Sequence, residues 1–118
     1  LARDMRLLVR ERLVAGDTDD ARRWIQRGLR DRPFSARLAI LLDGLPDDES
    51  DPKAGLRPLD VLRRAAGAEP TYPDLRRRLI LRHHREGYHE AARYQSSKWL
   101  DAEPNNDLAQ TTWREVAA

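Results

Sequence analysis

Two stretches of this 118-residue chain share one spacing of glycine, alanine and proline. In each stretch an alanine follows a glycine after five residues, and a proline follows the same glycine after seventeen. The residues are Gly16, Ala21 and Pro33 in the first stretch, and Gly87, Ala92 and Pro104 in the second. Glycine is typical of the position just after a helix, and proline stops a helix because it lacks the N–H and clashes with the preceding turn. Two copies of one turn-helix-stop unit, each with a small residue where a neighbouring helix can approach, predict an array of helical repeats.

Apolar residues recur at helical spacing through most of the chain, and glycine, proline and capping residues divide them into seven segments. The expected helices cover about 1–15, 17–32, 36–44, 58–68, 74–86, 89–102 and 107–118. Ser35 is expected to cap the third helix, and Asn105 or Asn106 the seventh. The predicted fold class is therefore all-α.

The stretch 45–56 breaks this pattern, because it is polar, acidic and flanked by proline. Its acidic part, Asp47–Asp51, carries the oxygen ligands that calcium prefers. A calcium loop of the EF-hand type needs glycine at its sixth position, whereas the sixth residue counted from Asp47 is Pro52. We therefore predict an exposed, solvated insertion.

Stop prolines recur along the chain at Pro33, Pro70 and Pro104. The two intervals agree if the acidic stretch carries a short insertion, and a helix-turn-helix unit of about 34 residues resembles the tetratricopeptide repeat. The residues that carry the resemblance are Leu8, Gly16, Ala21, Leu29 and Pro33 in the first unit, and Leu79, Gly87, Ala92, Leu100 and Pro104 in the third. The middle unit keeps Leu42 and Pro70, but Pro58 stands where the family places an alanine. The aromatic residue usual early in each unit is replaced by Met5, Ala39 and Arg76.

The resemblance implies an all-α, right-handed superhelix of about three helix-turn-helix units plus a C-terminal helix. The units cover about 1–35, 36–72 and 73–106 of a single domain, with the terminal helix at 107–118. Because the chain begins with Leu1 rather than Met, we expect it to be a piece of a longer protein. The segment 1–19 also resembles part of the haem-lyase subunit of bacterial cytochrome c maturation systems. That family has a cysteine pair just before this segment, whereas this chain has no cysteine and the likeness ends at Asp20.

Composition excludes several classes of function. Without cysteine the chain has no disulfide, no thiolate chemistry and no cysteine-based zinc site. No apolar run approaches the roughly 20 residues of a membrane span, and no signal peptide is visible. Lysine occurs only at Lys53 and Lys98, so nearly all basic residues are arginines, as is typical of the codon bias of GC-rich bacteria. We expect a soluble bacterial protein, of either the cytoplasm or the periplasm.

The residues that commonly carry chemistry form no catalytic or metal-binding pattern. His83 and His84 are adjacent, so their side chains point about 100° apart on a helix, and His89 lies beyond the break at Gly87. The serines lack the Gly-x-Ser-x-Gly setting of a nucleophile, and the sequence contains no glycine-rich phosphate loop. The three tryptophans are expected to pack in the core. We therefore predict no enzymatic activity, no cofactor and no metal site.

The resemblance to tetratricopeptide repeats also implies a concave groove, lined by the first helix of each unit. The family's groove positions fall on Arg3, Arg6, Arg10, Arg37, Arg77, His84 and Arg85. Only Asp74 is acidic among these positions, so the acidic residues are expected on loops and on the second helix of each unit. Arginines in a partly desolvated groove favour carboxylates or phosphates. The sequence thus predicts a non-enzymatic scaffold for protein–protein interaction that holds an acidic or extended partner segment.

Three alternatives stay open. The arginines can form a solvated helix face of an arginine-rich protein and nothing more. A nucleic-acid-binding helical repeat would use the same charges, although the net charge of only +2 and the lack of an extended basic tail argue against it. The chain can also be an accessory domain of a larger enzyme or of a secretion assembly.

Overall fold

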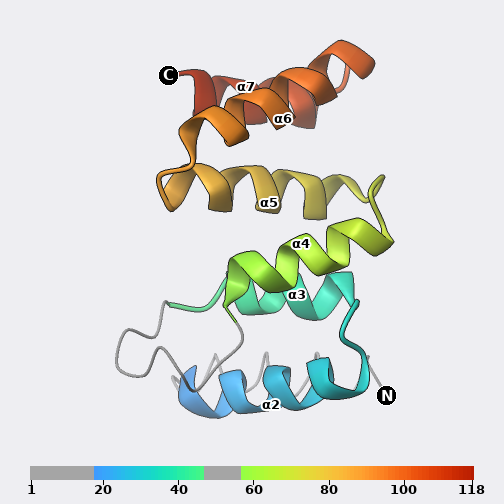
Figure 1. The fold of residues 1–118 in the computed structure, drawn as a ribbon, viewed down its shortest axis with the longest axis vertical. Coiled ribbons are helices and arrows are strands. Elements are labelled where there is room, and N and C mark those ends of the chain that lie inside the picture. Colours follow the sequence, from blue (N-terminus) through green and yellow to red (C-terminus); the bar gives the residue numbers. More distant parts are fainter. Residues whose placement is uncertain (1–17, 47–56) are drawn as a thin grey trace.

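The computed structural model describes residues 18–46 and 57–118, and these residues form six α-helices with no strand among them (Figure 1). The helices are α2 (Thr18–Asp31), α3 (Ala36–Asp43), α4 (Pro58–Ala68), α5 (Pro73–Arg85), α6 (His89–Ala102) and α7 (Asp107–Ala117). Along the longest axis of the molecule α2 lies at one end, and α6 and α7 lie side by side at the other end. For these residues the prediction of an all-α fold is confirmed. The helix expected at 1–15, the turn at Gly16 and the acidic stretch Asp47–Asp51 lie outside the described residues.

The described helices begin and end where prolines and capping residues predict. Each differs from its expected range by at most one residue at either end. Pro58 and Pro73 occupy the first turns of α4 and α5, where a helix does not need the missing N–H. Ser35 caps α3, because its hydroxyl oxygen accepts a hydrogen bond from the N–H of Leu38 at 3.3 Å.

Asparagine caps the last helix. The side-chain oxygen of Asn106 accepts hydrogen bonds from the N–H groups of Leu108 and Ala109 at 2.9 and 3.2 Å. These are two of the donors that the start of a helix leaves unsatisfied. Of the two asparagines that the sequence offers for this role, the structure therefore selects Asn106 and not Asn105.

Gly87 ends α5 in a left-handed conformation, with φ of 92°. Its N–H donates to the carbonyl of His84 at 3.2 Å, and the N–H of Tyr88 donates to the carbonyl of His83 at 2.8 Å. These two bonds form the Schellman arrangement, which satisfies the last carbonyls of a helix. The rings of His83 and Tyr88 meet edge to face with centroids 6.1 Å apart, which supplies the side-chain contact common at such ends. The predicted break at Gly87 is confirmed.

One backbone geometry recurs in the three turns that connect α2 to α3, α4 to α5 and α6 to α7. In each turn the residue before the proline donates its N–H four residues back and accepts a bond from the residue three ahead. The first bond runs from the N–H of Arg32 to the carbonyl of Gly28, from Glu69 to Ala65 and from Glu103 to Trp99. The second runs from the N–H of Ser35 to the carbonyl of Arg32, from Tyr72 to Glu69 and from Asn106 to Glu103. The recurrence of the stop prolines in the sequence therefore corresponds to a recurring turn in the structure.

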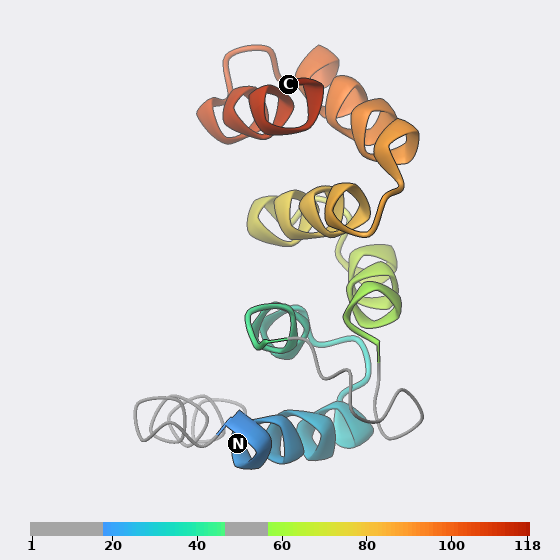
Figure 2. The ribbon, with the colours of Figure 1, turned by 90° about the vertical axis from the view of Figure 1, so that its left-hand side faces the viewer.

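Every helix from α2 to α7 packs against the next one along the chain, and α5 also contacts both α3 and α7. Among the described helices, no comparable contact joins α4 to α2 or to α6. Figure 2 shows α3, α5 and α7 in one column and α4 and α6 in another. The stack is therefore tighter along α3, α5 and α7 than along α4 and α6.

Two apolar clusters hold these helices together, and α5 contributes to both. The first cluster joins α2, α3 and α4 to the buried Leu75 of α5. The second joins Ile80 of α5 to α6 and α7, and it includes Trp99, which is 1 % exposed. Trp24 packs against the first cluster and Trp113 against the second, so the expected packing role of the tryptophans is confirmed. Within residues 18–46 and 57–118, no helix has the length and apolar character needed to cross a membrane.

Candidate functional site

The predicted site residues in the described part of the chain lie on α3 and, mainly, on α5. Two adjacent arginines of α5 reach in different directions. Arg77 donates from Nη2 to Oε1 of Glu115 on α7 at 2.9 Å. Nη1 of Arg78 lies 3.4 Å from Oδ2 of Asp43 at the end of α3, and Nε of Arg78 lies 3.7 Å from Oδ1 of Asp74. The first arginine therefore connects α5 to α7, and the second connects it to α3.

Asp74, Leu81 and Arg85 project between these two directions, because successive residues of a helix are about 100° apart. Asp74 and Arg85 are exposed and Leu81 is half-buried. The opposite arc of α5 carries His83, which contacts α4, and Arg76, whose guanidinium lies over an aromatic ring of α6. The arc with Asp74, Leu81 and Arg85 is therefore the side of α5 turned away from α4 and α6.

Equivalent positions on α3 and α7 are found by counting from the stop proline before each helix. On α3 these positions are Arg37, Ile40 and Leu41, and on α7 they include Thr111 and Glu115. Ile40 and Leu41 are half-buried, and the other three are exposed. We call this surface the inner face and define it by Arg37, Ile40, Leu41, Asp74, Arg77, Arg78, Leu81, Arg85, Thr111 and Glu115.

Three of the predicted groove residues, Arg37 on α3 and Arg77 and Arg85 on α5, fall on the inner face as it is defined by this count. His84 is half-buried at the edge of this face beside α6, where its Nδ1 lies 3.0 Å from Nδ1 of His89. Arg3, Arg6 and Arg10 lie outside the described residues.

Two carboxylates that the sequence does not predict here contact arginines of α5: Glu115 on the inner face, and Asp43 next to it. The acidic residues were expected on loops and on second helices, but Glu115 lies on α7 and Asp43 ends α3, and each holds an arginine of α5. That expectation is wrong for both residues. Counted from the stop prolines, Glu115 is equivalent to Leu81, but this becomes visible only when α7 is aligned as the first helix of another unit.

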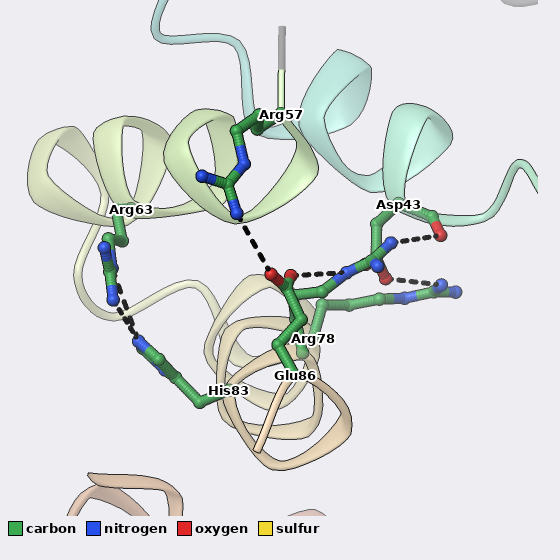
Figure 3. Close-up of polar contacts among 7 residues, drawn as sticks. Asp43, Arg57, Arg63, Arg78, His83 and Glu86 are labelled. Atoms are coloured by element: carbon green, nitrogen blue, oxygen red, sulfur yellow. Dashed lines mark hydrogen bonds and ion pairs between the residues drawn. The ribbon is translucent and has the colours of Figure 1, made fainter. Parts of the chain in front are cut away.

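Arg82 is the buried centre of a charge cluster between α3, α4 and α5. Figure 3 labels its neighbours Asp43, Glu86 and Arg57. Only 2 % of the Arg82 side chain is exposed, and its Nε donates to Oδ1 of Asp43 at 2.8 Å. Its Nη2 also donates to the backbone carbonyl of Asp43 at 3.3 Å. Oε2 of Glu86 lies 3.8 Å from Nε of Arg82, and Oε1 of Glu86 lies 3.7 Å from Nη2 of Arg57 at the start of α4. Because the carboxylates offset a buried charge, Arg82 serves the packing of α5 on α3.

His83 is buried and contacts α4 (Figure 3). Nε of Arg63 donates to Nε2 of His83 at 3.3 Å, so the ring proton is assigned to Nδ1. Burial, and next the positive charge of Arg63, lower the pKa of His83 below its usual value. The neighbouring Gln95 side chain, the backbone of Leu79 and the charge of Glu86 act on the pKa in the opposite direction but do not outweigh these causes. His83 is therefore a packing residue whose surroundings favour the neutral ring.

Within the described residues, no group of three or more His, Cys, Asp or Glu side chains is arranged to hold a metal ion. Comparison of the chain with protein-family models, with curated proteins and with solved structures finds no match. A function must therefore be inferred from the chemistry of the inner face itself.

Proposed function

We propose that this chain is a non-enzymatic scaffold that holds an extended, acidic segment of a partner protein along the inner face. In this proposal the helices belong to a right-handed superhelix of the tetratricopeptide type. The recurrence of one turn geometry supports the repeat. The contacts of α5 with α3 and α7 support the curvature, because closer spacing on one side bends a stack toward that side. The inner face is then the concave face of the array.

The guanidinium groups of the inner face are the reason for proposing an acidic partner. Arg77, Arg78 and Arg85 project from one arc of α5, and Arg37 adds a fourth guanidinium on α3. A guanidinium binds a carboxylate through two parallel hydrogen bonds, which gives orientation as well as attraction. The same face also carries half-buried isoleucine and leucine side chains. A segment in which acidic residues alternate with apolar ones matches both features, because an extended peptide is recognised through anchors spread over adjacent units.

The carboxylates on the inner face favour a peptide over a nucleic acid. Asp74 and Glu115 lie beside arginines of the same face. A nucleic-acid backbone carries a charge at every nucleotide, so it would meet repulsion from both residues. An extended peptide can instead place uncharged residues opposite them.

Selection of peptides from a phage-displayed random library on the complete chain tests this proposal. We expect the selected peptides to be enriched in aspartate and glutamate. A variant with Arg37→Gln, Arg77→Gln and Arg85→Gln should weaken their binding about tenfold or more, because hydrogen bonds to charged groups are the strong ones. Fluorescence anisotropy with labelled copies of the selected peptides measures this loss.

The matched control removes three exposed arginines from α2, α4 and α6, as Arg30→Gln, Arg64→Gln and Arg93→Gln. It changes the net charge equally, and we expect it to keep the affinity within about twofold, since exposed charges far from a ligand are screened. The proposal is rejected by selected peptides without acidic enrichment or by a control that weakens binding as much. It is also rejected if a short single-stranded RNA binds more tightly through the same arginines.

A further inference from the structure

Glu115 of α7 occupies a position on the inner face that a bound acidic segment would need. Its Oε1 accepts a hydrogen bond from Nη2 of Arg77 at 2.9 Å. The side chain of Glu115 is 50 % exposed, and that of Arg77 is 25 % exposed. The carboxylate therefore engages Arg77 from a position that solvent, and equally a ligand, can reach.

The contact between Arg77 and Glu115 differs in kind from the buried pair of Arg82 and Asp43. Arg82 is 2 % exposed and bonds both the carboxylate and the backbone carbonyl of Asp43, so it has no position to offer a ligand. Glu115 makes a single contact with Arg77 at the surface. Exposed single pairs contribute little to stability, because solvent and side-chain entropy offset the attraction. Glu115 is therefore replaceable by another carboxylate at little cost to the fold.

We propose that Glu115 is an internal competitor, whose carboxylate holds Arg77 until a carboxylate of the partner segment displaces it. This inference rests on the proposed function and specifies how the affinity of that site is set. A ligand with one acidic residue exchanges one carboxylate for another at Arg77 and gains little. A ligand with several acidic residues also gains the contacts with the remaining arginines, so Glu115 selects for multiply charged segments.

The test uses the complete chain and a dye-labelled peptide of glutamates as the probe, with binding followed by fluorescence anisotropy. Glu115→Gln keeps the shape of the side chain and removes its charge. We expect it to tighten binding about two- to fivefold, which is the range that an exposed ion pair provides. Asp101→Asn is the matched control, because Asp101 is exposed on α6, away from the inner face, and the substitution changes the net charge by the same amount. It should leave binding unchanged.

The double variant Arg77→Gln with Glu115→Gln separates a specific pair from a general charge effect. If Glu115 acts through Arg77, Glu115→Gln should no longer tighten binding once Arg77 is replaced. The melting temperature of Glu115→Gln should stay close to that of the wild type, as expected for a surface pair.

Outcomes that contradict this inference are distinct from those that contradict the proposed function. If Arg77→Gln weakens binding of the probe but Glu115→Gln does not tighten it, the competitor is ruled out and the binding face stands. Equal tightening by Asp101→Asn also rules it out. If the wild type and every variant fail to bind the probe, the proposed function fails and the inference fails with it.

Discussion

His83 makes the stability of this protein depend on pH through a single buried group. In the folded chain, burial and the charge of Arg63 favour the neutral ring, so the pKa of His83 lies below the usual 6.5 of a histidine. Between the folded pKa and 6.5 the unfolded chain binds more protons than the folded chain. The free energy of unfolding therefore rises with pH over that interval and is constant above it, as far as His83 is concerned.

We expect acidification below about pH 7 to lower the free energy of unfolding of the wild type more steeply than that of His83→Gln. Urea unfolding at a series of pH values measures both curves, and their difference isolates this residue from the carboxylates. In Arg63→Gln the burial of His83 remains but the neighbouring positive charge is gone. That variant should show a weaker pH dependence than the wild type. Parallel curves for the wild type and His83→Gln would contradict the assignment of a lowered pKa.

At the scale of the element, replacing a glycine by alanine is expected to change the free energy of unfolding in opposite directions in α4 and at the end of α5. Gly87 has φ of 92°, and a Cβ there would meet nothing within 4 Å. Gly87→Ala should therefore lower the free energy of unfolding by about 1–2 kcal/mol through the backbone alone, because L-residues disfavour the left-handed region. Gly67 lies inside α4, where a Cβ would also meet nothing within 4 Å. Gly67→Ala should raise the free energy of unfolding by about 0.5–1 kcal/mol. Denaturant unfolding of both variants measures the two changes, and a shared sign would contradict this account of where α5 ends.

Helix ends are the part of this fold that the sequence predicts best, because the signals that set them are local. Pro33 and Ser35 lie within a few residues of the helix ends that they determine. The choice between Asn105 and Asn106 is one that local signals in the sequence do not decide. Both residues suit a cap, and only the backbone of Asn106, with φ of −78° and ψ of 115°, points its side chain at the first N–H groups of α7.

The candidate site is predictable only in part. The helical period is also a local property, so it places Arg77 and Arg85 on one side of α5 without knowledge of the neighbouring helices. The partner of Arg77 is different, because Glu115 is 38 residues away in sequence. Its distance from Arg77 depends on how the second apolar cluster sets α7 against α5. Local patterns therefore identify which side chains share a face, and packing decides which charges they meet.

At the scale of the whole molecule, α5 is the element that two apolar clusters share. Leu75, near its start, belongs to the cluster with α2, α3 and α4. Ile80, further along, belongs to the cluster with α6 and α7. In a stacked array each unit contacts only its neighbours, so stability is approximately a sum of local terms. Damage to one cluster should then be felt mainly by the helices on its own side of α5.

Native-state hydrogen exchange tests this separation. Val116 is 1 % exposed in the second cluster, and Val116→Ala should cost about 2 kcal/mol for the lost methyl groups and the cavity they leave. We expect faster amide exchange in α6 and α7 and unchanged exchange in α2, α3 and α4. Leu42 is fully buried in the first cluster, and Leu42→Ala, at about 3 kcal/mol, should produce the reverse pattern. If either variant accelerates exchange equally in every described helix, the helices unfold as one cooperative unit and the proposal that the molecule is a repeat array is wrong.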